Sequence, residues 1–321
     1  MQREITCDQA VNEAIGEEMK RNSMVFLMGE DLYGNPTFGG KSLDLSLKKR
    51  VINTPISEPS FVGAGLGAAL TGMRPIVKLM FVDFSLMALD QISNQIAKIT
   101  YMSGGKAKVP LVIWAPEGAS GRSAAQHSQS LEAIFIGIPG LKVITPSTPY
   151  DVKGLFKTAI RDDNPVIFLT HKRLNYLKGH VPKEEYLIPF GQGLIKRKGD
   201  DVTIVSWLYT LNKSLVAAEQ LKNEGINVEV IDPRTLVPLD SKLILESVKK
   251  TGRLVVAEEE CKRGSVASEI AAFVAEEGFQ YLKAPIKRVA SKNVPIPFAK
   301  TMEDFVLPQV DDIVKAVKEI I

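Results

Sequence analysis

One carboxyl group stands where the chain passes from a strand to a helix. Glu58 follows the apolar stretch 50–56, and Ser57 and Pro59 beside it favour a helix start, because serine caps helices and proline is tolerated in the first turn. An acid in a first turn complements the helix dipole, and that role alone would account for Glu58. A buried carboxyl can instead exchange a proton with a bound ligand.

The helix after Glu58 carries a glycine pattern with two interpretations. Residues 63–68 read GAGLGA and match the GxGxxA pattern of dinucleotide-binding proteins, with Asp83 standing 20 positions after Gly63. In that pattern the glycines form the turn directly after a strand, whereas here the helix has already begun. Gly63 and Gly67 then share one helical face, where they would let another helix approach closely. A nicotinamide-dependent oxidoreductase is the distant alternative that this pattern leaves.

A second candidate, His127, lies in a loop rich in glycine and serine, residues 116–128. That setting favours a histidine that exchanges protons over one buried for structural reasons. Arg122 in the same loop could meet a substrate carboxylate, although an ordinary solvated arginine is the simpler interpretation. We expect His171 and His180 to lie at the surface.

The composition is that of an ordinary globular protein. The 321 residues are 45% apolar and 24% charged, with a net charge of +3 and dispersed basic runs, so no nucleic-acid partner is expected. Cys7 and Cys261 lack the spacing of a disulfide framework or a zinc site. No apolar run approaches the ~20 residues of a membrane helix. We therefore expect a cytoplasmic protein.

Apolar strands alternate with amphipathic helices along the whole chain, which predicts an α/β fold of two domains, each with a mainly parallel sheet flanked by helices. A loop is expected at 33–40 and a polar linker at 178–189. In the first domain we expect strands at 24–29, 50–56, 74–82, 110–115, 141–145 and 166–169, and helices at 7–21, 60–72, 84–102, 131–137 and 150–161. In the second we expect strands at 201–207, 227–232, 253–258 and 286–290, and helices at 211–224, 240–250, 265–277 and 309–320.

Seven sequence blocks, in order, resemble the beta subunit of the thiamine-dependent, decarboxylating first component of 2-oxo acid dehydrogenase complexes, a transketolase-like family. The blocks are TPISE at 54–58, YMSGG at 101–105, AAQHSQS at 124–130, PGLKV at 139–143, AIRDDNP at 159–165, IDPRT at 231–235 and VPIP at 294–297. The resemblance runs from about residue 5 to the end of the chain. It implies a pyrimidine-binding domain at 1–187 and a transketolase C-terminal-like domain at 188–321.

The resemblance also assigns roles to five residues. Glu58 matches the glutamate that hydrogen-bonds N1′ of the aminopyrimidine of thiamine diphosphate, and Phe84 matches an aromatic that packs on this ring. Ile56 and Met80 match positions near the cofactor and the acyl pocket. His127 matches an active-site histidine that acts in acyl transfer to a lipoyl group.

A monovalent-cation site is a further implication of the resemblance. In some members of the family, carbonyl oxygens at matching positions hold potassium, and hard oxygen ligands suit such an ion. A plain turn from helix to strand is the alternative. The matching residues are Leu111, Ala159, Ile160, Asp162 and Asn164.

One motif of thiamine enzymes is missing from this chain. The cofactor's diphosphate is normally held through magnesium by a Gly-Asp-Gly followed by an asparagine, whereas Gly199-Asp200 has no glycine after it. The resemblance therefore implies that an alpha subunit supplies magnesium and the diphosphate contacts, in an alpha2beta2 heterotetramer that serves a lipoyl acyltransferase core. Pyruvate or a branched-chain 2-oxo acid is the expected substrate, and acetoin is the alternative. A non-catalytic assembly subunit is the third class left open.

Overall fold

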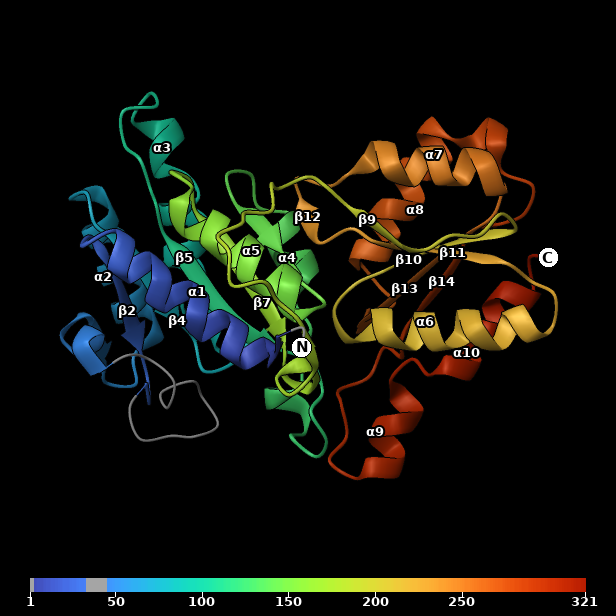
Figure 1. Ribbon diagram of the computed structural model, residues 1–321, viewed down its shortest axis with the longest axis horizontal. Helices are drawn as coiled ribbons and strands as arrows, with labels where there is room; N and C mark the ends of the chain where they lie inside the picture. The colour runs from blue at the N-terminus through green and yellow to red at the C-terminus, as the bar shows by residue number, and fades with distance from the viewer. Residues whose placement is uncertain (1–2, 33–44) are drawn as a thin grey trace. The chain divides into compact units, whose positions relative to one another are not determined.

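The computed structural model describes residues 3–32 and 45–321 (Figure 1). The loop expected at 33–40 lies outside the described residues. The chain forms two compact units: unit 1 comprises Met1–Glu117 and Ile134–Phe190, and unit 2 comprises Gly118–Ala133 and Gly191–Ile321. The division at residues 187 and 188 stays a prediction.

The core of unit 1 is a parallel sheet. Its strands lie in the order β6-β7-β5-β4-β2-β3, and each pair of neighbours is parallel. Central strands of such a sheet are covered on both faces, which explains why they read as unbroken apolar runs. The strands are β2 (Val25–Gly29), β3 (Val51–Asn53), β4 (Arg74–Lys78), β5 (Val112–Glu117), β6 (Lys142–Ile144) and β7 (Val166–His171).

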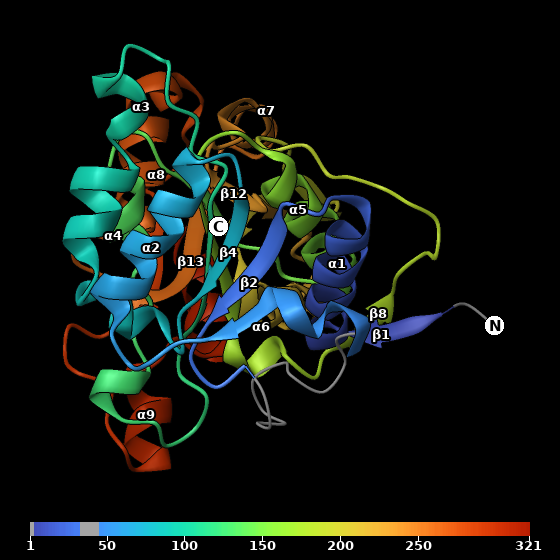
Figure 2. The same ribbon diagram turned by 90° about the vertical axis from the view of Figure 1, so that its left-hand side faces the viewer.

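Helices cover both faces of this sheet. The helices α1 (Cys7–Arg21) and α5 (Pro149–Arg161) pack together on one face, and α2 (Glu58–Leu70) covers the other (Figure 2). A capping box between Thr6 and Gln9 starts α1. The strand and helix types expected for this unit are confirmed, apart from the segment 84–102.

The single helix expected at 84–102 is wrong. The structure has a 3₁₀ turn, η2 (Val82–Leu86), a π-helical stretch, η3 (Gln91–Ile96), and a short helix, α3 (Ile99–Met102). The Ala97 amide donates to the Ile92 carbonyl, five residues back, at 3.0 Å. Ile92 and Ile96 are nevertheless both buried, so the apolar spacing is kept while the backbone pattern changes. Periodicity alone does not distinguish these backbone patterns.

The glycines of α2 lie inside the helix, which agrees with the packing interpretation. A Cβ at Gly65 would stand 2.6 Å from Val77 Cγ2, so this glycine lets α2 approach β4 closely. At Gly67 a Cβ would meet nothing within 4 Å, and at Gly63 only Gln91 Cγ at 3.7 Å. The face of Gly63 and Gly67 therefore stays open, and no glycine of the GxGxxA string forms a strand-to-helix turn.

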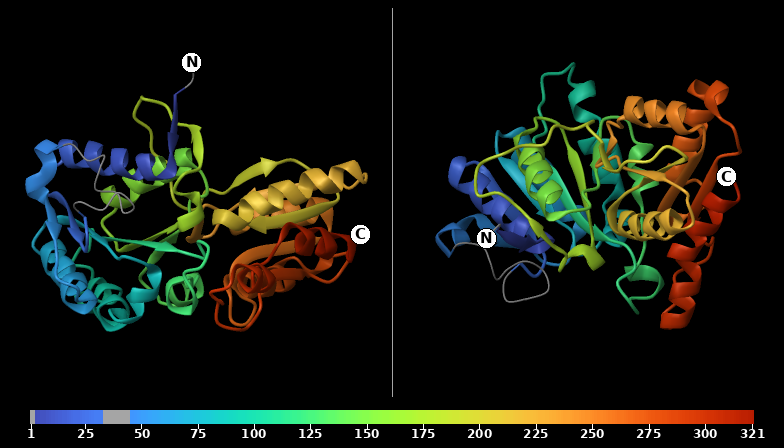
Figure 3. Two further views of the ribbon diagram at one scale, coloured as in Figure 1. Left: turned by 90° about the horizontal axis from the view of Figure 1, so that it is seen from below. Right: turned by 45° about the vertical axis from the view of Figure 1, so that its right-hand side comes forward.

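The two ends of unit 1 pair with each other. Strand β1 (Glu4–Thr6) runs antiparallel to β8 (Lys178–His180), with Ile5 opposite Gly179. Figure 3 shows the blue N-terminal strand beside the yellow-green β8. The segment expected as a linker thus begins with a strand. Unit 1 also contains the 3₁₀ turns η1 (Leu45–Arg50) and η5 (Lys172–Leu174).

Unit 2 is a second α/β sandwich. Its sheet has the order β14-β13-β10-β11-β9, parallel except for β9, which was not predicted. The helices α6 and α10 cover one face, and α7 and α8 the other (Figure 1). The strands are β9 (Leu194–Arg197), β10 (Val202–Ser206), β11 (Val228–Asp232), β13 (Leu254–Cys261) and β14 (Lys287–Ser291). The helices are α6 (Leu208–Asn223), α7 (Ser241–Thr251), α8 (Val266–Glu277) and α10 (Val310–Lys318).

Short elements complete the chain. Strand β12 (Thr235–Val237), helix α9 (Lys300–Val306) and the 3₁₀ turns η4 (Ala125–His127) and η6 (Phe279–Tyr281) belong to unit 2. Helix α4 (Glu132–Ile136) spans the point where the chain returns to unit 1. Both cysteines are free thiols, Cys7 buried and Cys261 exposed. Within residues 3–32 and 45–321, no helix has the length and apolar character needed to cross a membrane.

Candidate active site

Glu58 is the first residue of α2, and its side chain is buried. Glu30 directly follows β2, and its carboxyl lies close enough to Glu58 to feel its charge. Burial, and then the charges of Glu58 and Asp31, raise the pKa of Glu30 above its ordinary value. Glu30 can therefore keep a proton beside the start of α2 at a pH above the ordinary glutamate pKa.

Three other predicted residues lie after the carboxyl ends of β3 and β4, the strands on either side of β2. Ile56 follows β3, Met80 follows β4, and Phe84 lies in η2 with its ring 5.9 Å from that of Phe81. In open parallel sheets, ligands bind outside this edge. Met80 and Phe84 are half-buried, but Ile56 is 83% exposed. In this chain alone, the apolar side chain of Ile56 at the site is therefore exposed to solvent.

Two polar residues at the same edge were missed by the sequence analysis. Glu30 stands just after the expected strand 24–29, and an acid at such a strand end is the signal that would have found it. Lys78 ends β4 with its ammonium 5.1 Å from the centre of the Trp114 ring. Burial lowers the pKa of Lys78 to about 8, although the negative charges of Asp8 and Asp31 act to raise it.

His127 belongs to unit 2, whereas Ile56, Glu58, Met80 and Phe84 belong to unit 1. It ends the turn η4 and is half-buried. A cavity of about 390 Å³ in unit 2 is lined by residues on both sides of it in sequence, Gln126 and Ser128, and by Glu259, Glu260 and Cys261 of β13. The polar loop setting expected for His127 is confirmed.

The expected surface position is confirmed for His180 and wrong for His171. His171 is buried, with 1% of its surface exposed. Strand β7 runs to residue 171 rather than 169, so the histidine lies within the sheet opposite Glu117 of β5. Its Nδ1 accepts a hydrogen bond from the Arg173 amide at 3.1 Å.

The five residues of the predicted potassium site gather around the turn from α5 to β7. Leu111 stands just before β5, and its carbonyl accepts from the Val166 amide at 2.9 Å. Arg74 Nη1 donates to the carbonyls of Ile160 and Asp162, each at 2.9 Å. The Ala159 carbonyl accepts from the Asp162 amide at 3.3 Å, and Asn164 bonds the Asp162 carboxylate. Carbonyl oxygens are ligands that suit a hard cation, but the Arg74 guanidinium already bonds two of them.

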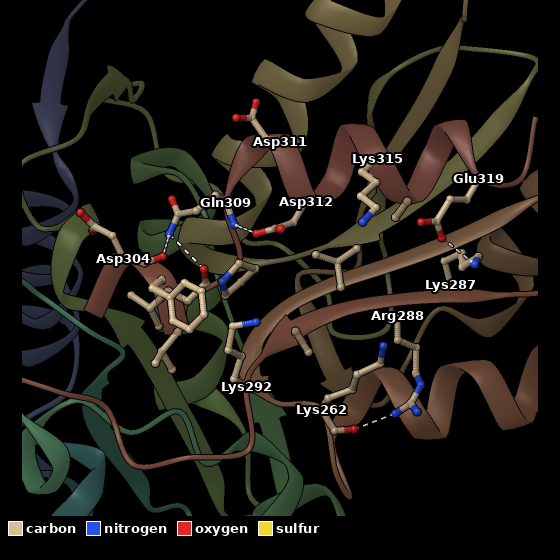
Figure 4. Close-up of a pocket in the computed structure, with 17 residues that line it drawn as sticks. Lys262, Lys287, Arg288, Lys292, Asp304, Gln309, Asp311, Asp312, Lys315 and Glu319 are labelled. Carbon is tan, nitrogen blue, oxygen red and sulfur yellow. Dashed lines mark hydrogen bonds and ion pairs between the residues drawn. The ribbon is translucent and has the colours of Figure 1, made fainter. Parts of the chain in front are cut away.

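A second cavity in unit 2, of about 520 Å³, is lined by none of the site residues predicted from the sequence (Figure 4). Basic side chains of β14 and acidic ones of α10 line it together, and Lys287 pairs with Glu319 at 2.7 Å. In the described part of the chain, no three histidine, cysteine or acidic side chains gather as metal ligands.

Two buried glutamates of β13 carry displaced pKa values. Burial raises the pKa of Glu258 to about 8. Burial, followed by the nearby charges of Glu132 and Glu258, also raises the pKa of Glu260. Backbone amides partly offset the rise in these pKa values by donating hydrogen bonds to the carboxyl groups. The Ala267 amide donates to Glu258 at 3.0 Å. Glu258 therefore stays protonated in the folded chain at pH values where an unfolded glutamate has lost its proton.

Unit 2 is expected to lose stability as the pH rises from the ordinary glutamate pKa to about 8. Between the ordinary glutamate pKa and about 8, the folded chain holds a proton at Glu258 that the unfolded chain has lost. The free energy of unfolding then falls by up to about 1.4 kcal/mol per pH unit for each such group. Urea unfolding of a Trp114→Phe chain, in which Trp207 reports on unit 2, should show this slope. Glu258→Gln should flatten it, whereas exposed Glu277→Gln should leave it unchanged; equal slopes in all three chains would contradict the assignment.

Family models match both halves of the chain. Residues 3–177 match the family described as transketolase, pyrimidine binding domain, and residues 191–313 match transketolase, C-terminal domain. A solved structure described as a split-gene transketolase, inactive beta4 tetramer, is 24% identical, with a TM-score of 0.82 and 98% of each chain covered. It shows the fold alone. Two domains of transketolase type therefore make up this protein.

Curated relatives narrow the family further. The beta subunit of acetoin:2,6-dichlorophenolindophenol oxidoreductase from Cupriavidus necator is 47% identical over 99% of this chain and 98% of its own length. The pyruvate dehydrogenase E1 beta subunit of Rickettsia felis is 47% identical over the same shares. The 2-oxoisovalerate dehydrogenase beta subunit of Bacillus subtilis is 42% identical over 97% of each. The chain belongs to the family of beta subunits of 2-oxo acid and acetoin dehydrogenase E1 components, which confirms the resemblance and the expected fold class.

Proposed function

We propose that this chain is the beta subunit of a thiamine-diphosphate-dependent 2-oxo acid dehydrogenase of pyruvate or branched-chain type. The observation that carries the proposal is the buried carboxyl of Glu58, which lies near the carboxyl of Glu30 at the carboxyl edge of a domain of pyrimidine-binding type. The reaction is oxidative decarboxylation of the 2-oxo acid, with transfer of the acyl group to a lipoyl domain. The relatives named for pyruvate and 2-oxoisovalerate support this reaction.

The residues of this chain would act on the cofactor from one side. Thiamine diphosphate supplies the electron sink that lets a 2-oxo acid lose carbon dioxide. Glu58 would hold a proton at the pyrimidine nitrogen N1′, and Phe84 would pack against the ring. Ile56 and Met80 would form the apolar wall beside the cofactor and the acyl group. His127 would donate a proton to a dithiolane sulfur, or orient it, during transfer to the lipoyl group.

The site requires a second chain in this proposal. Ile56 is 83% exposed, so the wall it forms needs a cover, and the diphosphate-binding motif is missing from the sequence. An alpha subunit would bring magnesium and the diphosphate contacts within an alpha2beta2 heterotetramer, and a lipoyl acyltransferase core would receive the acyl group. The name beta subunit, carried by the relatives, supports such a partner. We also propose a cytoplasmic location, which the two free cysteines support.

Acetoin is the second candidate substrate. Two beta subunits of acetoin:2,6-dichlorophenolindophenol oxidoreductases are 47% and 45% identical to this chain. Pyruvate and acetoin differ by little in size, and one methylene in an apolar pocket changes selectivity by only about 1 to 3 kcal/mol. Identity alone therefore does not choose between the two substrates.

Reconstitution with the alpha subunit tests the proposal. The purified pair, supplied with thiamine diphosphate and magnesium, should reduce 2,6-dichlorophenolindophenol with one substrate among pyruvate, 2-oxoisovalerate and acetoin. Either chain alone should give no turnover. Robust turnover by this chain without a partner would contradict the shared site, and a pair inactive with all three substrates would leave the non-catalytic alternative.

Thermal melting of the same pair in equal concentrations of KCl and NaCl tests the potassium site. Bound potassium would raise the melting temperature only in KCl. The site tested is that of Leu111, Ala159, Ile160, Asp162 and Asn164.

A further inference from the structure

Three buried glutamate carboxyl groups of unit 2 bind the segment 118–133, which carries His127. Each accepts a hydrogen bond from a backbone amide of this segment, and each side chain lies almost entirely out of solvent. Glu259 accepts from the Ala119 amide at 2.6 Å, Glu303 from the Arg122 amide at 2.9 Å, and Glu260 from the Ala133 amide at 2.8 Å. The amide of Gly118 also donates to the Gln129 carbonyl at 2.9 Å and closes the base of the loop.

The held segment has a strained backbone just before His127. Arg122 has φ 64° and Ala124 has φ 57° with ψ −166°, although neither is a glycine. The second conformation lies at the border of a region that is essentially restricted to glycine. Such residues keep these angles only where surrounding contacts over-determine them, and they cluster at functional sites. The bond from Glu303 reaches Arg122 itself, at the start of the strained stretch.

We propose that Glu259, Glu260 and Glu303 are positioning residues that fix the place of His127 for acyl transfer to a lipoyl group. The inference rests on the proposed role of His127. Glu259 and Glu260 extend from β13 to the two ends of the segment, and Glu303 extends from α9 to the start of its strained stretch. His127 stands between these anchor points, so its backbone is fixed from both sides. None of the three carboxyl groups needs to touch a substrate for this role.

The chain contains a matched control for a purely structural role. Glu258 precedes Glu259 on β13 and is also buried, but it accepts from the Ala267 amide at the start of α8. Removing Glu258 should therefore weaken unit 2 without releasing the segment that carries His127. A glutamine at position 259 or 303 retains a carbonyl oxygen that can accept the same amide hydrogen bond.

The test compares two rates in the reconstituted alpha–beta complex. One is acyl transfer to a lipoylated domain, and the other is substrate-dependent reduction of 2,6-dichlorophenolindophenol, which bypasses the lipoyl group. His127→Ala should lower the ratio of the first rate to the second by about 100-fold, the lower end of the usual effect of a proton donor. Glu259→Ala and Glu303→Ala should lower the same ratio in the same direction, by at most the about 100-fold that misplacement of a catalytic group can cost. Glu259→Gln and Glu303→Gln should restore it, and Glu258→Ala should lower the melting temperature at an unchanged ratio.

Equal losses in both rates for Glu259→Ala and Glu303→Ala, or no restoration by glutamine, would overturn the inference. If the alanine variants do not fold, Ala124→Gly replaces them. It relieves the strained backbone, so it should not lower the melting temperature but should lower the ratio; an unchanged ratio would overturn the inference as well. A wild-type complex that is inactive with both acceptors would instead overturn the proposed function, and the positioning role with it.

Discussion

Replacing Glu58 by glutamine is expected to lower the turnover of the reconstituted complex by about 10²- to 10⁴-fold, the usual contribution of general acid–base catalysis. The amide of glutamine can still hydrogen-bond the pyrimidine, but it does not exchange a proton. Cofactor retention should change much less than turnover for this reason. Steady-state assays with 2,6-dichlorophenolindophenol, together with thiamine diphosphate binding by calorimetry, measure the two quantities.

A second acid separates the proton role from the helix-dipole role. Glu269 lies in the first turn of α8 and is exposed, so Glu269→Gln removes a dipole-complementing charge and nothing else. Turnover should be unchanged in this variant. If Glu58→Gln also keeps turnover within about threefold of the wild type, well below the usual acid–base effect, Glu58 is a dipole partner and the non-catalytic interpretation gains ground.

Replacing Glu18 by alanine is expected to cost unit 1 about 3 kcal/mol of unfolding free energy, the lower end of the range for breaking a buried ion pair. Glu18 is fully buried on α1 and accepts from Arg161 Nη2 of α5 at 2.6 Å and from Arg21 Nε at 2.7 Å. Its removal leaves the Arg161 guanidinium without its main partner between the two helices. The estimate lies at the lower end because the side chain of Arg161 keeps 25% of its surface in solvent.

The matched control is Glu185, which binds the same guanidinium from the surface. Its side chain is 60% exposed, so water and salt screen the contact and Glu185→Ala should cost much less unfolding free energy than Glu18→Ala. Urea unfolding in a Trp207→Phe background lets Trp114 report on unit 1 alone. Similar losses for Glu18→Ala and Glu185→Ala would show that the buried position of Glu18 is not what stabilises the contact.

Much of the architecture was predictable because each central strand is a short apolar run between turn residues. The strands from Val25 and Val202 needed no tertiary information, since parallel strands covered on both faces leave no polar alternation to misread. The π-helical stretch at 91–96 was not predictable, because the apolar spacing of Ile92 and Ile96 suits more than one helical pattern. The edge strands β1 and β9 are three and four residues long, which is too short for a periodic signal.

In the candidate site, too, some features follow from local sequence and others only from tertiary contacts. Glu58 and His127 stand out by local context and by the blocks that surround them. The contacts that support them are different, because Glu30 approaches Glu58 through the order of the strands, and Glu303 meets Arg122 across 181 positions of sequence. His171 was misplaced for a related reason, since the end of β7 depends on pairing with β5. Long-range pairing of this kind leaves no trace in local sequence.

The pairing of β1 with β8 has a consequence for the synthesis of the protein. Ile5 pairs with Gly179 in the two-stranded sheet. Helix α1 can contact the charged groups of α5 only after the chain has been synthesised as far as residue 161. A chain that emerges from the ribosome N-terminus first must therefore carry α1 without its docking surface until most of unit 1 has been made. Contacts between such distant residues slow folding, and the exposed apolar face favours aggregation in the meantime.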